Sequence, residues 1–174
     1  MSEPAAPFNF MGWIEENRHL LKPPVGNREV YPASDDFIVM VVGGPNRRTD
    51  FHIDPYEELF YQLKGNMHVK IMADGKPRDV HIREGEMWLL PAGVPHSPQR
   101  PEEGSVGLVI ERVRKEGTRE KFQWYCFDCH ALVHEVELQV RDIVADLPPV
   151  FNAFYENEQA RTCDNCGALH PGKG

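Results

Sequence analysis

The chain has 174 residues, of which 41% are hydrophobic, and its formal net charge at pH 7 is −8. This length and composition predict one compact domain with a sizeable core. Acidic and basic residues are interspersed and form no basic stretch, which argues against a nucleic-acid or anionic-membrane partner. The N-terminus has no basic segment followed by an apolar run, and no segment reaches membrane-spanning length, so a cytoplasmic location is expected.

The first predicted element is a short amphipathic helix over residues 9–21, which the prolines in "KPPVGN" should end. From there to about residue 115, short stretches rich in β-branched and aromatic residues alternate with glycine and proline. They predict strands at residues 36–44, 58–65, 67–75, 78–85, 86–93 and 105–113. Short strands at such intervals favour a mainly β fold, an antiparallel sandwich or jelly roll.

The last third of the chain holds all four cysteines, in two C-x2-C pairs: Cys126, Cys129, Cys163 and Cys166. Two such pairs in a chain without a secretion signal favour a metal over disulfides. Between the pairs, residues 131–140 alternate like a strand and residues 147–161 predict a helix. We therefore expect a β-barrel with the catalytic site over residues 1–115 and a small metal-binding tail over residues 116–174, too short to form a core alone.

The stretch "FHIDPYEELFYQLKG", residues 51–65, holds four candidate metal ligands close together: His52, Asp54, Glu57 and Glu58. If the glutamates begin a strand, their side chains point to opposite faces, and only one of them can join a site inside a barrel. Glu58 shares its face with a phenylalanine and a glutamine, and Glu57 shares its face with leucines and a tyrosine. Periodicity alone does not choose between the two.

Two stretches resemble the signature motifs of the cupin superfamily. Residues 85–100, "GEMWLLPAGVPHSPQR", are similar to the second motif, with arginine where asparagine is common. In the first motif, His-x-His-x3-or-4-Glu-x6-Gly, the matching positions hold His52, Asp54, Glu58 and Gly65. The resemblance implies a cupin-type antiparallel jelly-roll β-barrel and assigns the ligand position to Glu58, with aspartate in place of the second histidine.

The ligands that the resemblance implies are His52, Glu58 and His96. Two histidines and one carboxylate can hold Fe(II) with open positions for substrate and O2, although Zn, Mn or Ni would also suit them. Asp54 precedes Pro55, so we expect it to shape the turn and not to bind metal. The other histidines are expected to be solvated or hydrogen-bonded: His19, His68, His81, His130, His134 and His170.

A longer set of stretches narrows the resemblance. "LLKPPVGNREVY", "VVGGPNRRTDFHIDPYEELFYQLKGNM", "LLPAGVPHSPQRP" and "VIERVR", followed by the cysteine tail, together resemble the bacterial 3-hydroxyanthranilate 3,4-dioxygenases over nearly the whole chain. The resemblance implies Fe(II)-dependent, extradiol-type cleavage of 3-hydroxyanthranilate by O2 to 2-amino-3-carboxymuconate semialdehyde. That product closes without an enzyme to quinolinate, a precursor of NAD. The resemblance also implies a homodimer.

The same resemblance assigns roles at the substrate. Arg48 and Arg100 would bind the substrate carboxylate, which the planar guanidinium matches bidentately, and each lies four residues from a histidine ligand. In extended segments each would share a face with that ligand, while Arg47 would point to solvent. Glu111 would hydrogen-bond the substrate and handle a proton, with Glu58 beside it. Surface ion pairing is the alternative role for either arginine.

Several alternatives stay open on the sequence. The four thiolates suit zinc or a rubredoxin-like iron, and a structural staple is favoured over electron transfer or metal supply. The chain could also be another metal-dependent cupin dioxygenase or isomerase, or a non-catalytic cupin that binds a small molecule. Two buried arginines would favour a substrate that carries a carboxylate. Only turnover would exclude the binding cupin.

Overall fold

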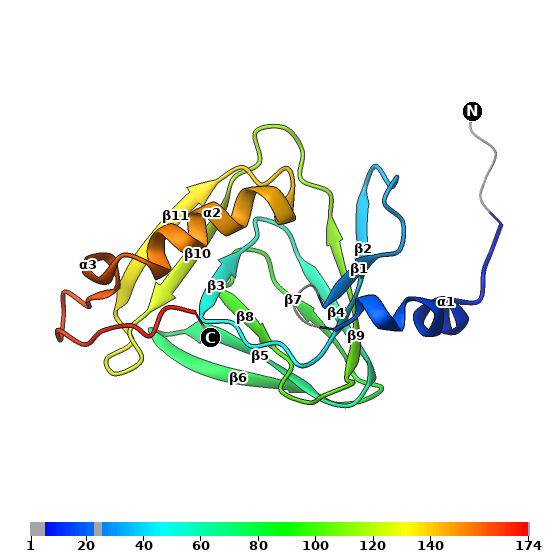
Figure 1. The fold of residues 1–174 in the computed structure, drawn as a ribbon, viewed down its shortest axis with the longest axis horizontal. Helices are drawn as coiled ribbons and strands as arrows, with labels where there is room; N and C mark the ends of the chain where they lie inside the picture. The colour runs from blue at the N-terminus through cyan, green and yellow to red at the C-terminus, as the bar shows by residue number, and fades with distance from the viewer. Residues whose placement is uncertain (1–5, 23–25, 174) are drawn as a thin grey trace.

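The computed structural model describes residues 6–22 and 26–173, so Pro23 and Pro24, expected to end the first helix, lie outside the described residues. Two antiparallel sheets make up most of the fold, and helices lie near both ends of the chain (Figure 1). The prediction of a mainly β, jelly-roll-like fold is confirmed. Within the described residues, no helix is long and apolar enough to cross a membrane.

The first sheet has five strands in the order β1-β2-β9-β4-β7. Their bounds are β1 Asn27–Glu29, β2 Phe37–Gly43, β4 Glu58–Lys64, β7 Met87–Leu90 and β9 Val106–Arg112. On β4, the buried side chains alternate with more exposed ones, and the buried set is Glu58, Phe60 and Gln62. The glutamate that the motif spacing selected therefore points inward, and Glu57 is exposed.

The second sheet has six strands in the order β11-β10-β3-β8-β5-β6. Their bounds are β3 Asp50–Ile53, β5 Met67–Ala73, β6 Lys76–Ile82, β8 His96–Gln99, β10 Glu120–Tyr125 and β11 Leu132–Leu138. The predicted hairpin turn joins β5 to β6, with Asp74 and Gly75 at positive φ. The strand predicted over residues 78–85 begins two residues earlier and ends at Ile82, because the turn needs only Asp74 and Gly75.

The main hydrophobic core lies between the two sheets. Phe60, Leu90 and Val109 come from the five-stranded sheet, and they pack with Val69 and Ile71 from the six-stranded sheet. These residues line the inner faces on which Glu58 and His96 also lie. The core therefore fixes the distance between the strands that carry the predicted metal ligands.

The N-terminal helix is confirmed as α1 Phe10–Asn17, followed by a 3-10 turn, Arg18–Leu20. Asn9 caps α1 because its side chain accepts a hydrogen bond from the amide of Gly12. Ile14 packs against Val41 and Val106 on the five-stranded sheet. Because Val41 faces away from the core between the sheets, α1 covers the part of the sheet's outer face around Val41 and Val106 and leaves the inner face free for the site.

The C-terminal region continues the six-stranded sheet, because β10 pairs with both β3 and β11. The proposed boundary near residue 115 falls between β9 and β10, so the proposed tail shares a sheet with the barrel. The prediction of one helix over residues 147–161 is wrong: α2 spans Ile143–Tyr155 and α3 spans Glu158–Arg161. Asn157 separates them, because its side chain caps α3 by accepting from the amide of Ala160.

Candidate active site

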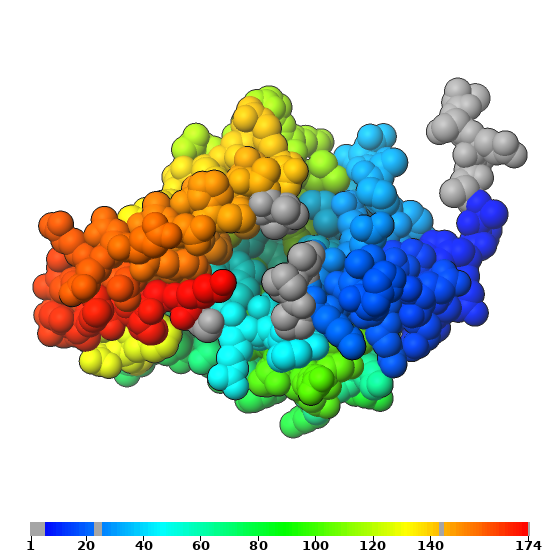
Figure 2. All heavy atoms as spheres, in the orientation of Figure 1, coloured from blue at the N-terminus to red at the C-terminus, as the bar shows by residue number. Residues whose placement is uncertain are grey.

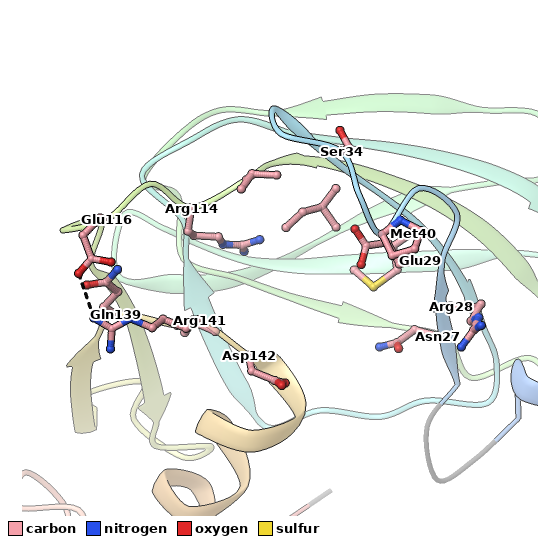
Figure 3. Close-up of a pocket in the computed structure, with 14 residues that line it drawn as sticks. Asn27, Arg28, Glu29, Ser34, Met40, Arg114, Glu116, Gln139, Arg141 and Asp142 are labelled. Atoms are coloured by element: carbon pink, nitrogen blue, oxygen red, sulfur yellow. Dashed lines mark hydrogen bonds and ion pairs between the residues drawn. The ribbon is translucent and has the colours of Figure 1, made fainter. Parts of the chain in front are cut away.

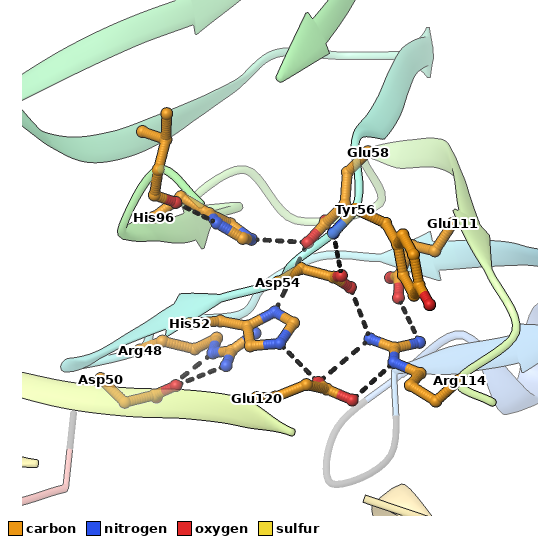
Figure 4. A network of polar contacts seen from close by, with 11 residues as sticks. Arg48, Asp50, His52, Asp54, Tyr56, Glu58, His96, Glu111, Arg114 and Glu120 are labelled. Atoms are coloured by element: carbon orange, nitrogen blue, oxygen red, sulfur yellow. Dashed lines mark hydrogen bonds and ion pairs between the residues drawn. The ribbon is translucent and has the colours of Figure 1, made fainter. Parts of the chain in front are cut away.

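Three of the predicted metal ligands meet between the sheets. His52 on β3 and His96 on β8 are paired across adjacent strands, and Glu58 reaches them from the start of β4 (Figure 4). Glu58 Oε1 lies 2.9 Å from His96 Nε2 and 3.4 Å from His52 Nδ1. No member of the group is more than 8% exposed. Both sheets are therefore needed to assemble the site.

This group fits a divalent metal ion. Glu58 Oε1 is buried and has no hydrogen bond of good geometry, although both imidazoles are close to it. One ligand atom from each of the three residues lies within 4.8 Å of the other two. Burial acts against ionisation, but the charges of His96 and His52, which lie close to the carboxylate, hold the pKa of Glu58 well below its usual value. An ionised carboxylate with two imidazoles is a donor set for Fe(II) and similar ions.

Asp54 has the turn role expected of it. It is buried, and its Oδ1 accepts a hydrogen bond from the amide of Tyr56 at 2.7 Å, which is an Asx turn at Pro55. Its other oxygen lies 3.0 Å from Nη2 of Arg114. Asp54 is therefore already held by the protein on both oxygens.

Two residues of the site were not singled out by the sequence patterns: Glu120, which is buried, and Arg114, whose side chain is largely shielded from solvent. Arg114 lies after β9 and contacts three carboxylates: those of Asp54, Glu111 and Glu120 (Figure 4). Glu120 also lies against a nitrogen of His52. With these contacts the site contains an ionic network that spans β3, β9 and β10.

Glu111 lies beside the metal-ligand group, as its predicted role requires. One ligand atom each from Asp54, Glu58 and Glu111 lies within 4.8 Å of the other two. Burial and the neighbouring charge of Glu58 raise the pKa of Glu111, and the ion pair with Arg114 opposes that shift. Glu111 is therefore a carboxyl group whose proton affinity is increased by its surroundings, next to the ion's expected position.

The two predicted substrate arginines have different surroundings. Arg48 pairs with Asp50 and keeps part of its side chain exposed. Arg100 is 1% exposed and donates a hydrogen bond to Oε1 of Gln62, on the same inner face of β4 as Glu58. Among the residues that the structure describes, no acidic side chain forms an ion pair with Arg100. Burial lowers the pKa of Arg100 to about 10.

A cavity of about 650 Å³ lies beside the site and could admit a small molecule (Figure 3). The apolar side chains of Ile38 and Met40, on β2, line one part of the cavity. Arg114, which forms an ion pair with Glu111, lines another part. Asn27 from β1 and Asp142 before α2 form other parts of the wall. In Figure 2 the surface is hollowed in this region, between α2 and the N-terminal strands.

The four cysteines form a second candidate metal site. The sulfurs of Cys126 and Cys166 are 3.5 Å apart and those of Cys129 and Cys163 are 3.6 Å apart, so no disulfide is present. With Zn–S bonds of about 2.3 Å, the sulfurs of a tetrahedral site lie about 3.8 Å apart. The hydrogen bond from Asn165 is the largest cause that lowers the pKa of Cys129 to about 6. The four residues therefore fit one tetrahedral ion.

Several known proteins are similar to this chain. A model of the 3-hydroxyanthranilic acid dioxygenase family matches residues 1–155. The 3-hydroxyanthranilate 3,4-dioxygenase of Shewanella woodyi is 60% identical over 173 residues, 99% of this chain and 90% of that protein. The enzyme of the same name from Burkholderia cenocepacia is 61% identical over 167 residues, 96% and 94% of the two chains. A solved cupin-2 domain protein of Shewanella frigidimarina is 19% identical and has a TM-score of 0.47, covering 57% of this chain and 92% of that one. The chain belongs to the 3-hydroxyanthranilic acid dioxygenase family.

Proposed function

We propose that this protein opens the ring of 3-hydroxyanthranilate with O2 and forms 2-amino-3-carboxymuconate semialdehyde, using Fe(II). The relatives that cover nearly the whole chain carry the name of this activity. The observation that carries the proposal is the pairing of two features between the two sheets. One is the buried group of His52, Glu58 and His96, and the other is the buried Arg100, which has no carboxylate partner among the described residues.

The metal centre of the proposed reaction would be held by His52, Glu58 and His96. When bound, Fe(II) would supply activation of O2 and a point of chelation for the amino and hydroxyl groups of the substrate. Both sheets bury these three side chains, and this burial keeps bulk water from the reacting groups. The proposed site therefore combines a fixed ligand set with a dry interior.

The protein's own side chains would bind and orient the rest of the substrate. Arg100 and Arg48 would take the carboxylate, because each guanidinium can form two parallel hydrogen bonds to it. Glu111, whose pKa is raised by burial and by Glu58, would accept the proton of the substrate hydroxyl. The apolar wall of Ile38 and Met40 would border the aromatic ring. Together these contacts would fix which ring carbon faces O2.

An oxygen-uptake assay tests the proposal. Metal-free protein is loaded with Fe(II) without air, given 3-hydroxyanthranilate and then exposed to O2, and the product is identified by mass. Iron-dependent uptake that adds both oxygen atoms to the substrate is the expected result. Substrate binding without O2 uptake would instead identify a non-catalytic binding protein. A metal-loaded protein that neither binds 3-hydroxyanthranilate nor consumes O2 would refute the proposal.

We also propose that the four-cysteine site, with zinc or iron, is a structural staple. It ties the hairpin of β10 and β11 to the end of the chain, where Cys163 and Cys166 follow α3. Cys126→Ser is expected to lower thermal stability clearly while turnover per bound active-site iron changes less than about twofold, since closed four-cysteine sites are usually structural. Thermal melting and iron-normalised kinetics check this. A folded, iron-loaded and inactive variant would contradict it.

We further propose that the protein is a homodimer that buries the outer face of the five-stranded sheet. Phe37, Met87 and Leu89 are more than half exposed there, and a groove of about 420 Å³ runs between Leu59, Leu89 and Ile110. Exposed apolar patches of this kind mark association surfaces. Leu89→Glu is expected to shift the mass measured by light scattering from dimer to monomer. A wild-type monomer at micromolar concentration would contradict this assignment.

A further inference from the structure

Glu120 is the buried carboxylate closest to the predicted metal ligands that has no assigned role. It is 1% exposed, and its Oε2 lies 2.6 Å from Nε2 of His52. Phe122, two residues along β10, stacks on the imidazole of His52 with 4.9 Å between ring centres and 13° between planes. β10 therefore fixes both the plane and one nitrogen of His52.

Arg114 in turn holds Glu120. Its Nε donates to Glu120 Oε1 at 2.7 Å and its Nη2 donates to Oε2 at 3.3 Å, which is a two-point contact. The same guanidinium lies 3.0 Å from Asp54 and 2.7 Å from Glu111. The side chain of Arg114 is only 8% exposed, so these contacts are shielded from solvent. One arginine thus connects the carboxylate behind His52 with the predicted substrate residue.

The two predicted histidine ligands have their second nitrogens engaged in different ways. His52 directs Nδ1 toward Glu58 and Nε2 toward the Glu120 carboxylate. His96 directs Nε2 toward Glu58 and Nδ1 toward the backbone carbonyl of Val94, at 3.0 Å. A hydrogen bond at the second nitrogen selects which nitrogen is free to bind a metal, and a carboxylate partner makes the imidazole a stronger ligand.

We propose that Glu120, clamped by Arg114, is a positioning residue that holds His52 with Nδ1 toward the metal and Nε2–H donated to Glu120. This inference rests on the metal centre of the proposed function. His52 then has the stronger, charge-assisted hydrogen bond, to the Glu120 carboxylate, and His96 has a neutral one, to the backbone carbonyl of Val94. Loss of the partner of a metal-bound histidine typically weakens metal affinity about 10- to 100-fold.

The first test measures Co(II) affinity by competition with a chelating dye, without turnover. Glu120→Ala is expected to weaken Co(II) binding about 10- to 100-fold, and Glu120→Gln, whose amide oxygen still accepts from Nε2–H, is expected to weaken it less. The matched control is Glu137→Gln on the adjacent strand β11, an exposed glutamate paired with Arg119. Circular dichroism establishes that each variant is folded.

The second test reads the imidazole protons directly by proton NMR of the Co(II) protein. Two exchangeable, paramagnetically shifted N–H signals are expected, one from each histidine. In Glu120→Ala the His52 signal should disappear through exchange with solvent, and the His96 signal should remain. In Glu120→Gln both signals should remain, and the His52 signal should have a changed chemical shift. Unchanged Co(II) affinity and both signals intact in the two Glu120 variants would overturn the proposal. If the Glu120 variants change Co(II) affinity and the N–H signals as expected but the Fe(II)-loaded wild-type protein shows no dioxygenase turnover, the proposed function alone is refuted.

Discussion

Replacing Glu58 with glutamine is expected to lower the affinity of the active-site metal by more than about 100-fold and to reduce turnover to background. The adjacent Glu57→Gln is expected to leave both unchanged. Glu58 is buried with its Oε1 between two imidazoles, while Glu57 is exposed on the outer side of the sheet. An amide retains the shape of the side chain but lacks the charge that holds a divalent ion.

The comparison of these neighbours separates metal binding from general effects of removing a negative charge. Both variants change the net charge equally, so a difference between them reports on the position of the carboxylate. Active-site metal content is measured after dialysis against a chelator, with the four-cysteine site quantified separately. Equal metal loss in both variants, or retained iron and activity in Glu58→Gln, would show that the assigned ligand is wrong.

The metal ligand among these two glutamates could be predicted from the sequence. Motif spacing selected Glu58, and the alternation of Glu58, Phe60 and Gln62 along one buried face of β4 agrees with that choice. Short strands with clear alternation and glycine turns predict sheets well because both signals are local. The pairing of β3 with β8, which sets His52 opposite His96, depends on contacts 44 positions apart. The cupin resemblance implied that the two histidines share a metal, but it did not predict this strand pairing.

Glu120 and Arg114 show where reading the sequence was insufficient. The contact between His52 and Glu120 joins residues 68 positions apart, and the contact between Asp54 and Arg114 joins residues 60 positions apart. One signal was present: Glu120 is in phase with Phe122 and Trp124 on the buried face of β10. A glutamate in phase with buried aromatic residues indicates a buried carboxylate that needs a partner. For Arg114, nothing in its local sequence distinguishes it from a surface arginine.

The prediction of one continuous C-terminal helix was wrong for a different reason. Residues 147–161 carry a helical pattern throughout, but α2 ends at Tyr155 and Asn157 caps α3. Asparagine is compatible with both roles, so its local sequence does not decide between a continuous and a broken helix. After this break the chain places the sulfurs of Cys163 and Cys166 next to those of Cys129 and Cys126. The geometry of the four sulfurs thus explains a boundary that periodicity alone did not reveal.

Replacing Arg100 with methionine is expected to affect binding and stability differently. If Arg100 binds the substrate carboxylate, its loss should cost about 2–5 kcal/mol of binding, which lowers kcat/KM for 3-hydroxyanthranilate roughly 30- to 4,000-fold. The free protein, in contrast, buries this cation without an ion-pair partner among its described side chains. Removing the charge should therefore lower the free energy of unfolding by no more than about 1 kcal/mol, the loss of the hydrogen bond to Gln62.

The substrate without its carboxylate, 2-aminophenol, makes this prediction specific. Wild-type protein and Arg100→Met should bind 2-aminophenol equally, because the analogue has no group for the guanidinium to recognise. Arg47→Met, which removes an exposed arginine next to Arg48, is the matched control and should leave both ligands unaffected. Isothermal titration of the metal-loaded proteins without O2 gives the affinities, and denaturant unfolding gives the stabilities. If Arg100→Met weakens the two ligands equally, the arginine supports the shape of the site and does not bind the carboxylate.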